Sequence, residues 1–177
     1  MILMKVEKKM IKGMNKSCCK LNEMEILKKY LTESQIFGEN FDKNFTKNEN
    51  ALNLIYKASK DGFGVKDFHR KCDGISKVVV LIKANDFLFG GYTPQSWNSR
   101  NYKERWVYCD QTFIFSLSNP QNKPTIFKSV QPQYSFCDFA SYGPCFGCIN
   151  CDIFISDNSD EKASSYSFLG YTYKGKN

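Results

Sequence analysis

Short strand-like segments separated by turn residues are the feature that most restricts how this chain can fold. From about residue 50 onward they recur at 52–56, 77–83, 87–92, 112–117, 125–128 and 152–155. Several short strands at such spacing, with little helix between them, are typical of two packed antiparallel sheets. We therefore predict a mainly β (α+β) chain that forms a two-sheet antiparallel β-sandwich with short peripheral helices.

Local patterns in the same region place one hairpin and one helix. Segments 77–83 and 87–92 flank a tight connection at Asn85-Asp86, which predicts an antiparallel hairpin. Residues 65–72 carry apolar side chains at helical spacing and predict a short helix. Phe, Tyr and Trp make up 15% of the chain, and such residues favour a β-rich core.

The N-terminal part of the chain has a different composition. Residues 1–29 hold eight lysines and three glutamates, so five of the chain's seven net positive charges lie there. Apolar residues also recur there at helical spacing, at Leu21, Met24, Leu27 and Leu31. We predict that residues 1–33 are a basic helical N-terminal extension in front of a domain that spans residues 34–177.

Charge and hydropathy restrict the partners and the location of the chain. The lysine-rich extension is either a solvated helix or a peripheral contact to an anionic membrane surface. It contains no Arg, the usual residue for reading bases and phosphates, so we expect no specific nucleic-acid binding. The longest apolar run, 78–82, is too short for a membrane helix, and Lys5 interrupts any signal-peptide core. We expect a cytoplasmic protein with reduced cysteines.

The single histidine limits the catalytic mechanisms that are available. Any Ser-His-Asp or Cys-His mechanism must use His69, and Cys72 lies three residues further along the predicted helix. Cys72, however, belongs to the apolar face of that helix, whereas His69 lies beside Arg70 and Lys71, whose charges disfavour an imidazolium. We predict that His69 is structural and points away from the apolar face. We expect no catalytic residue, no cofactor-binding residue and no cofactor.

Four of the eight cysteines lie close together in the sequence, at Cys137, Cys145, Cys148 and Cys151. Thiols at such intervals resemble zinc or iron–sulfur ligands, but no separated second pair completes such a site. We therefore predict buried thiols and no metal. Two alternatives remain open: a metal site formed by all four cysteines, and a redox sensor formed by Cys145, Cys148 and Cys151. Asp152, beside Cys151, disfavours the thiolate that a sensor needs.

Seven segments, in order, resemble the TLDc domain family, whose eukaryotic members include the oxidation-resistance proteins. They are 54–63, 68–74, 89–93 with Trp97, 112–117, 142–147, 151–155, and 165–170 with Tyr173. The resemblance covers residues 34–177 and implies the same two-sheet sandwich. It also implies a non-catalytic interaction domain of the oxidative-stress-protection type, which binds a cytosolic protein such as the peripheral sector of the vacuolar proton pump.

The chain departs from the family pattern in two places. Cys148-Ile-Asn-Cys151 stands where the family often has a glycine-rich stretch, so any redox role for these thiols would be peculiar to this protein. Family members also continue past the segment at 165–173 into a further strand, which we expect to be missing here. Either the chain is a fragment, or residues 1–33 compensate for that strand.

Overall fold

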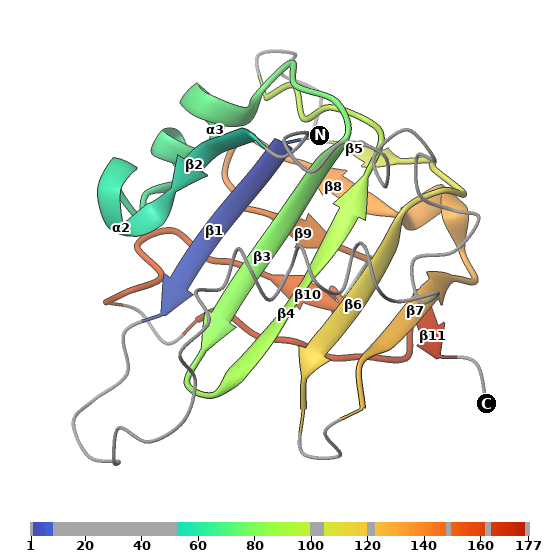
Figure 1. The fold of residues 1–177 in the computed structure, drawn as a ribbon. Helices are drawn as coiled ribbons and strands as arrows, with labels where there is room; N and C mark the ends of the chain where they lie inside the picture. The colour runs from blue at the N-terminus through green and yellow to red at the C-terminus, as the bar shows by residue number, and fades with distance from the viewer. Residues whose placement is uncertain are drawn as a thin grey trace.

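Two β-sheets lie face to face in the computed structural model of the chain (Figure 1). The structure describes residues 2–8, 53–99, 105–119, 123–147, 150–161 and 164–175. Among these residues the chain is mostly strand, with a few short helices. The predicted two-sheet β-sandwich with short helices is therefore confirmed.

The larger sheet has seven strands in the order β11-β7-β6-β4-β3-β1-β2. Their bounds are β1 Ile2–Lys8, β2 Asn53–Lys57, β3 Val78–Ala84, β4 Phe87–Thr93, β6 Phe113–Ser118, β7 Thr125–Ser129 and β11 Tyr173–Gly175. From β3 to β11 all neighbours pair antiparallel, and β3 and β4 form the predicted hairpin. The bounds of β2, β3, β4, β6 and β7 agree with the predicted segments to within one residue.

The smaller sheet has four antiparallel strands in the order β10-β9-β8-β5. Their bounds are β5 Arg105–Val107, β8 Phe136–Asp138, β9 Cys145–Phe146 and β10 Ile153–Phe154. Helices α2 (Ala58–Asp61) and α3 (Val65–Cys72) lie beside β2, and a 3-10 turn covers Pro132–Tyr134. Among the described residues, no helix is long and apolar enough to span a bilayer. The sequence pattern indicated only β10 of this sheet, because strands of two or three residues are too short to show a period.

Strand β1 corrects the prediction of a helical extension over residues 1–33. Residues 2–8 lie in the larger sheet between β2 and β3 and run parallel to both (Figure 1). Their pairing with residues 78–84 joins segments 76 positions apart, which no local pattern of charge or hydropathy can reveal. The predicted helical stripe from Leu21 to Leu31, and the lysines that follow β1, lie outside the described residues.

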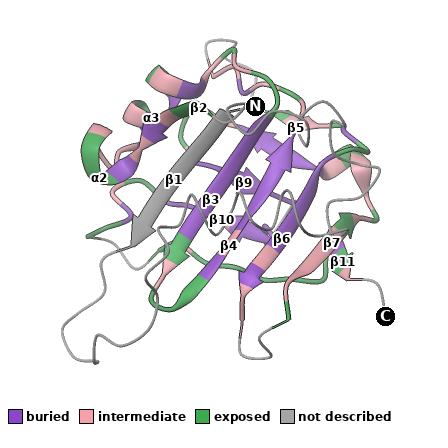
Figure 2. Cartoon of the chain, viewed as in Figure 1, coloured by how far each residue is buried: buried purple, intermediate pink, exposed green. Residues whose placement is uncertain are grey.

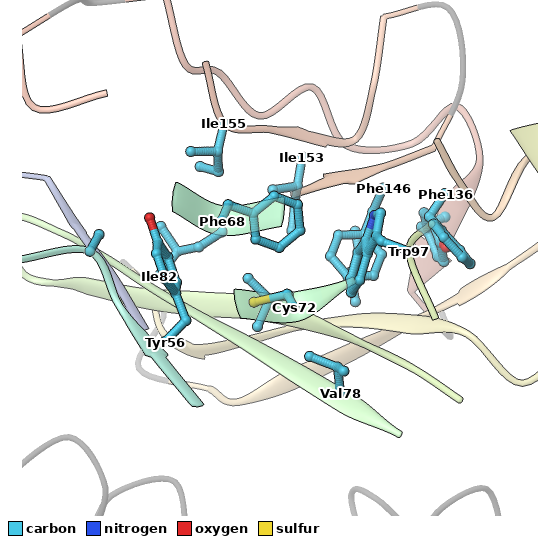
Figure 3. Packing of buried hydrophobic residues seen from close by; sticks show 14 residues of the cluster. Tyr56, Phe68, Cys72, Val78, Ile82, Trp97, Phe136, Phe146, Ile153 and Ile155 are labelled. Atoms are coloured by element: carbon cyan, nitrogen blue, oxygen red, sulfur yellow. The ribbon is translucent and has the colours of Figure 1, made fainter. Parts of the chain in front are cut away.

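The core between the sheets is built around Trp97, which is fully buried. Its ring centroid lies 5.4 Å from that of Phe68 on α3, 5.2 Å from Phe136 on β8 and 6.2 Å from Phe146 on β9 (Figure 3). The indole N–H donates to the carbonyl oxygen of Cys137 at 3.2 Å, so the polar end of the ring is satisfied. One side chain therefore joins α3 to β8 and β9, the two central strands of the smaller sheet.

Strand β3 is buried on both faces, as its uninterrupted apolar run from Val78 to Ile82 requires (Figure 2). Val78, Val80 and Ile82 face the core between the sheets. Val79 and Leu81, which point to the opposite face by the two-residue period of a strand, are each no more than 1% exposed. The larger sheet thus buries apolar side chains on both of its faces near β3.

Two glycines on β4 allow close packing, one within the larger sheet and one between the sheets. A Cβ on Gly90 would lie 1.8 Å from the carbonyl oxygen of Val80 on the neighbouring strand β3, and one on Gly91 would lie 2.6 Å from the Phe146 ring of β9. Gly90 thus permits a close approach of two backbones, and Gly91 permits a close approach of the smaller sheet. Because Gly91 has no side chain, the Phe146 ring of the smaller sheet packs directly against the backbone of the larger one.

We expect Gly91→Ala to destabilise the fold by about 1–3 kcal/mol, because the added methyl group overpacks the contact with Phe146. Gly175→Ala is the matched control, since its Cβ would meet nothing closer than 3.5 Å. Urea denaturation followed by tryptophan fluorescence measures both free energies of unfolding. Equal stability of the two variants would contradict this account of the interface.

Candidate functional site

His69 is buried on α3 and both of its ring nitrogens have partners. Nδ1 lies 2.7 Å from the Asp73 carboxylate, and Nε2 lies 2.9 Å from the Tyr142 carbonyl oxygen and 3.2 Å from that of Phe139. Only 7% of the residue is exposed. The prediction that His69 points away from the apolar face is wrong, because α3 packs its His69 side against the segment that contains Phe139 and Tyr142.

His69, Asp73 and Ser99 are the same residue types as in a Ser-His-Asp catalytic triad, but their hydrogen bonds connect them in a different order. The Ser99 hydroxyl and its backbone N–H donate to the Asp73 carboxylate at 2.5 and 3.0 Å, so the serine bonds the acid and not the histidine. In a triad the second imidazole nitrogen contacts the nucleophile, whereas here it faces main-chain carbonyl oxygens. These hydrogen bonds hold α3 against the loop that contains Ser99 and the loop that contains Phe139 and Tyr142.

Cys72 is the thiol nearest to His69 in the sequence, and it is fully buried. Burial raises the pKa of this thiol well above its usual range, and the negative charges of Asp73 and Asp61 act in the same direction. Nucleophilic cysteines act as thiolates and need a lowered pKa. The environment of Cys72 therefore suits a packed side chain in the core.

Three of the four cysteines that the sequence singles out come together in the smaller sheet. Cys137 on β8 and Cys145 on β9 stand opposite each other across the strand pair and form a disulfide, with their Cα atoms 5.7 Å apart. The sulfur of Cys151 lies 3.0 Å from that of Cys145. All three residues are at most 3% exposed, and Cys148 lies outside the described residues.

The disulfide corrects the expectation that all cysteines are reduced. That expectation came from the presumed compartment, whereas the bond follows from strand pairing, which places residues 137 and 145 side by side. The three candidate ligand atoms lie within 4.8 Å of one another. Two of them bond each other, so in this state they do not offer the separate thiolates that a zinc or iron–sulfur site uses.

Asp152 is a buried carboxylate that fastens the C-terminal segment. It is fully buried, and it accepts the backbone N–H groups of Gly170 at 3.0 Å, Thr172 at 3.0 Å and Tyr173 at 3.3 Å. Hydrogen bonds to an ionised acceptor are stronger than neutral ones, so three of them hold this segment firmly. The sequence pattern did not predict this role; the available signal was an acidic residue at the start of the predicted strand 152–155.

The fastened segment carries exposed apolar side chains, and we call residues 166–171 the C-terminal aromatic loop. Its exposed members are Tyr166 at 46%, Phe168 at 61%, Leu169 at 49% and Tyr171 at 41%. The loop leads directly into β11, where exposed Lys174 stands opposite exposed Lys128 of β7. Grouped exposed apolar side chains mark interaction sites more often than isolated ones do.

A small cavity of about 10 Å³ lies where the start of α3 meets the turn at Gly143 and Pro144. Tyr56, Phe63 and Phe68 form its apolar wall. Pockets that bind small molecules usually measure about 300–1,000 Å³. This pocket is below that range, and the exposed C-terminal aromatic loop is the stronger candidate for a functional surface.

Comparison with known proteins gives one match. The family model of the TLDc domain matches residues 21–177, which include every described element except β1. No curated protein and no solved structure shows significant similarity to the chain.

We expect the burial of Cys72 to make the fold less stable at alkaline pH. The unfolded chain loses the thiol proton above about pH 8.5, while the folded chain keeps it. The unfolded state then binds fewer protons, so the free energy of unfolding falls by up to about 1.4 kcal/mol per pH unit. Urea denaturation between pH 7 and 10 should show a shallower decline for Cys72→Ala; identical slopes for wild type and variant would refute this.

We expect Asp152→Asn to destabilise the protein by about 1.5–3 kcal/mol, because the amide replaces one charged acceptor by a donor that faces backbone N–H groups. Limited proteolysis should cut the C-terminal aromatic loop faster in this variant. Asp160→Asn, at an exposed position, is the control that should change neither quantity. A loop that resists protease equally in all three proteins would argue against Asp152 as its fastening point.

Proposed function

Because the chain belongs to the TLDc domain family, whose domains are related to oxidative stress, we propose that it acts by binding a protein partner and not by catalysis. The family supports a protein-interaction role for the chain as a whole. The arrangement of His69, Asp73 and Ser99 supports the non-catalytic part of the proposal, since the hydroxyl and the imidazole bond separate partners.

The partner in this proposal is the peripheral, cytosolic sector of the vacuolar proton pump, which places the protein in the cytoplasm. The support for this partner is the family likeness of the sequence. Lys128 and Lys174 add a local argument. These like charges lie directly opposite each other in a strand pair and repel, and an acidic group that approaches both would relieve the repulsion. An acidic surface on the partner would supply that group.

The single observation that carries the proposal is the C-terminal aromatic loop. Phe168, the most exposed of its four apolar side chains, has its backbone N–H bonded to the carbonyl oxygen of Asp152 at 3.2 Å. A backbone that is already held in place loses little conformational entropy on binding. Aromatic side chains are enriched among the residues that contribute most to protein–protein affinity. A rigid backbone that presents exposed aromatic rings therefore suits a binding surface.

The loop is also tied to the larger sheet, so that both parts of the proposed surface move together. The backbone N–H of Val130 donates to the carbonyl oxygen of Thr172 at 2.8 Å, and the Gln131 side chain donates to that of Tyr171 at 3.2 Å. Val130 is itself 52% exposed and lies next to the aromatic residues through this bond. The apolar surface thus continues from the loop to the end of β7.

We expect Phe168→Ala to weaken binding to the purified peripheral sector about 30-fold, the effect of losing a residue worth about 2 kcal/mol at an interface. Surface plasmon resonance with the immobilised sector measures the dissociation constants. Phe87→Ala is the matched control, because Phe87 is 42% exposed at the β3–β4 hairpin and outside the proposed surface.

Two results would count against the proposal in different ways. Wild-type protein that does not bind the sector would exclude this partner. Binding that is reduced equally by Phe168→Ala and Phe87→Ala, or by neither, would exclude the C-terminal aromatic loop as the contact surface.

A further inference from the structure

The sulfur of Cys145 has two other sulfurs within reach. It is covalently bonded to the Cys137 sulfur. The Cys151 sulfur lies 3.0 Å from it, without a covalent bond. Thiol–disulfide exchange requires a thiolate to contact a disulfide sulfur directly. Cys151 therefore already occupies the position from which it could attack the bond between Cys137 and Cys145.

We propose that Cys145 exchanges its disulfide partner between Cys137 and Cys151, so that the folded chain exists as two disulfide isomers. In the forward step the Cys151 thiol gives up its proton and the thiolate attacks the sulfur of Cys145. The Cys145–Cys151 bond forms, the Cys137–Cys145 bond breaks, and Cys137 leaves as a thiolate that takes up a proton. Each isomer holds one disulfide and one thiol, so the step needs no oxidant or reductant.

The backbone holds both possible partners against Cys145. Cys137 is placed by strand pairing, because residues 136 and 146 are paired in the antiparallel register of β8 and β9. Cys151 follows β9 and has a backbone φ of 23°, in a region that residues other than glycine rarely adopt. That conformation persists because Asp152, the next residue, is fixed by the three backbone hydrogen bonds described above.

The surroundings keep the exchange within the chain. Trp106, Phe139, Tyr142 and Phe154 pack around the three sulfurs and form an aromatic cover. Together with the burial of the cysteines, this cover makes attack by solvent thiols and peroxides slower than attack by the neighbouring Cys151. Because the attacking group must be a thiolate, we expect the exchange to accelerate as the pH rises.

The two isomers connect different parts of the smaller sheet. The Cys137–Cys145 bond crosses from β8 to β9, whereas a Cys145–Cys151 bond would join β9 to the residue that precedes Asp152 and β10. The exchange therefore moves a covalent link from one side of β9 to the other. It does not depend on the proposed partner of the protein.

Peptide mapping of the full chain tests the proposal. The protein is equilibrated in glutathione buffers of different redox potential, quenched in acid, denatured and blocked with N-ethylmaleimide before digestion. Chymotrypsin cuts after Tyr142 and Phe146 and so separates Cys137, Cys145 and the peptide that holds Cys148 and Cys151; fragmentation then distinguishes the last two.

We expect wild type to contain both disulfides, with the minor isomer at about 1–10% of the oxidised protein. The ratio of the two isomers should stay constant while the glutathione potential changes their sum, because they are equally oxidised. Cys137→Ser should contain only the Cys145–Cys151 bond, Cys151→Ser only the Cys137–Cys145 bond, and Cys148→Ser should behave as wild type.

The wild-type measurement keeps the test decisive even if a variant fails to fold. Absence of the Cys145–Cys151 peptide from wild type above about 0.1% would overturn the proposal. A dominant bond to Cys148, or one zinc ion bound per chain by the reduced thiols, would overturn it as well.

Discussion

The Phe146 ring of β9 packs against Gly91 of β4, and this contact holds the two sheets together at the centre of the core. The ring of the smaller sheet can lie against β4 only because Gly91 has no side chain there. Trp97 then packs at 89° to the same ring and joins it to α3 through Phe68. Since Cys145 precedes Phe146 on β9, this contact also fixes where the thiol cluster lies.

In the loops, where helix and strand hydrogen bonds are absent, buried carboxylates hold backbone N–H groups in place. Asp73 accepts from Ser99, Asp138 accepts the backbone N–H of Asn98 at 2.8 Å, and Asp152 accepts three backbone N–H groups. A buried backbone N–H without a partner is costly, and a charged oxygen satisfies it strongly. Asp73 therefore fixes the end of α3 to a loop, and Asp138 and Asp152 fix loops to strands that are only two or three residues long.

One short segment links the two features that bear on function. Asp152 holds the C-terminal aromatic loop, and Cys151 immediately before it contacts the disulfide. Partial removal of the Tyr166 hydroxyl from water raises the pKa of this loop residue, and neighbouring Cys151 adds to that effect, so the thiol cluster lies close to the loop. Both the loop and the thiol cluster lie in the region that the family model matches.

Local patterns in the sequence were enough to predict β2, β3, β4, β6, β7 and helix α3, which follow from alternation, apolar runs and turn residues. Such patterns also singled out Cys137, Cys145 and Cys151, because their spacing is visible in one stretch. They could not predict the place of β1 beside β3, the pairing of Cys137 with Cys145 or the burial of His69. Each of these depends on contact between segments that are not neighbours in the chain, and such contacts form only when the two sheets pack together and exclude water.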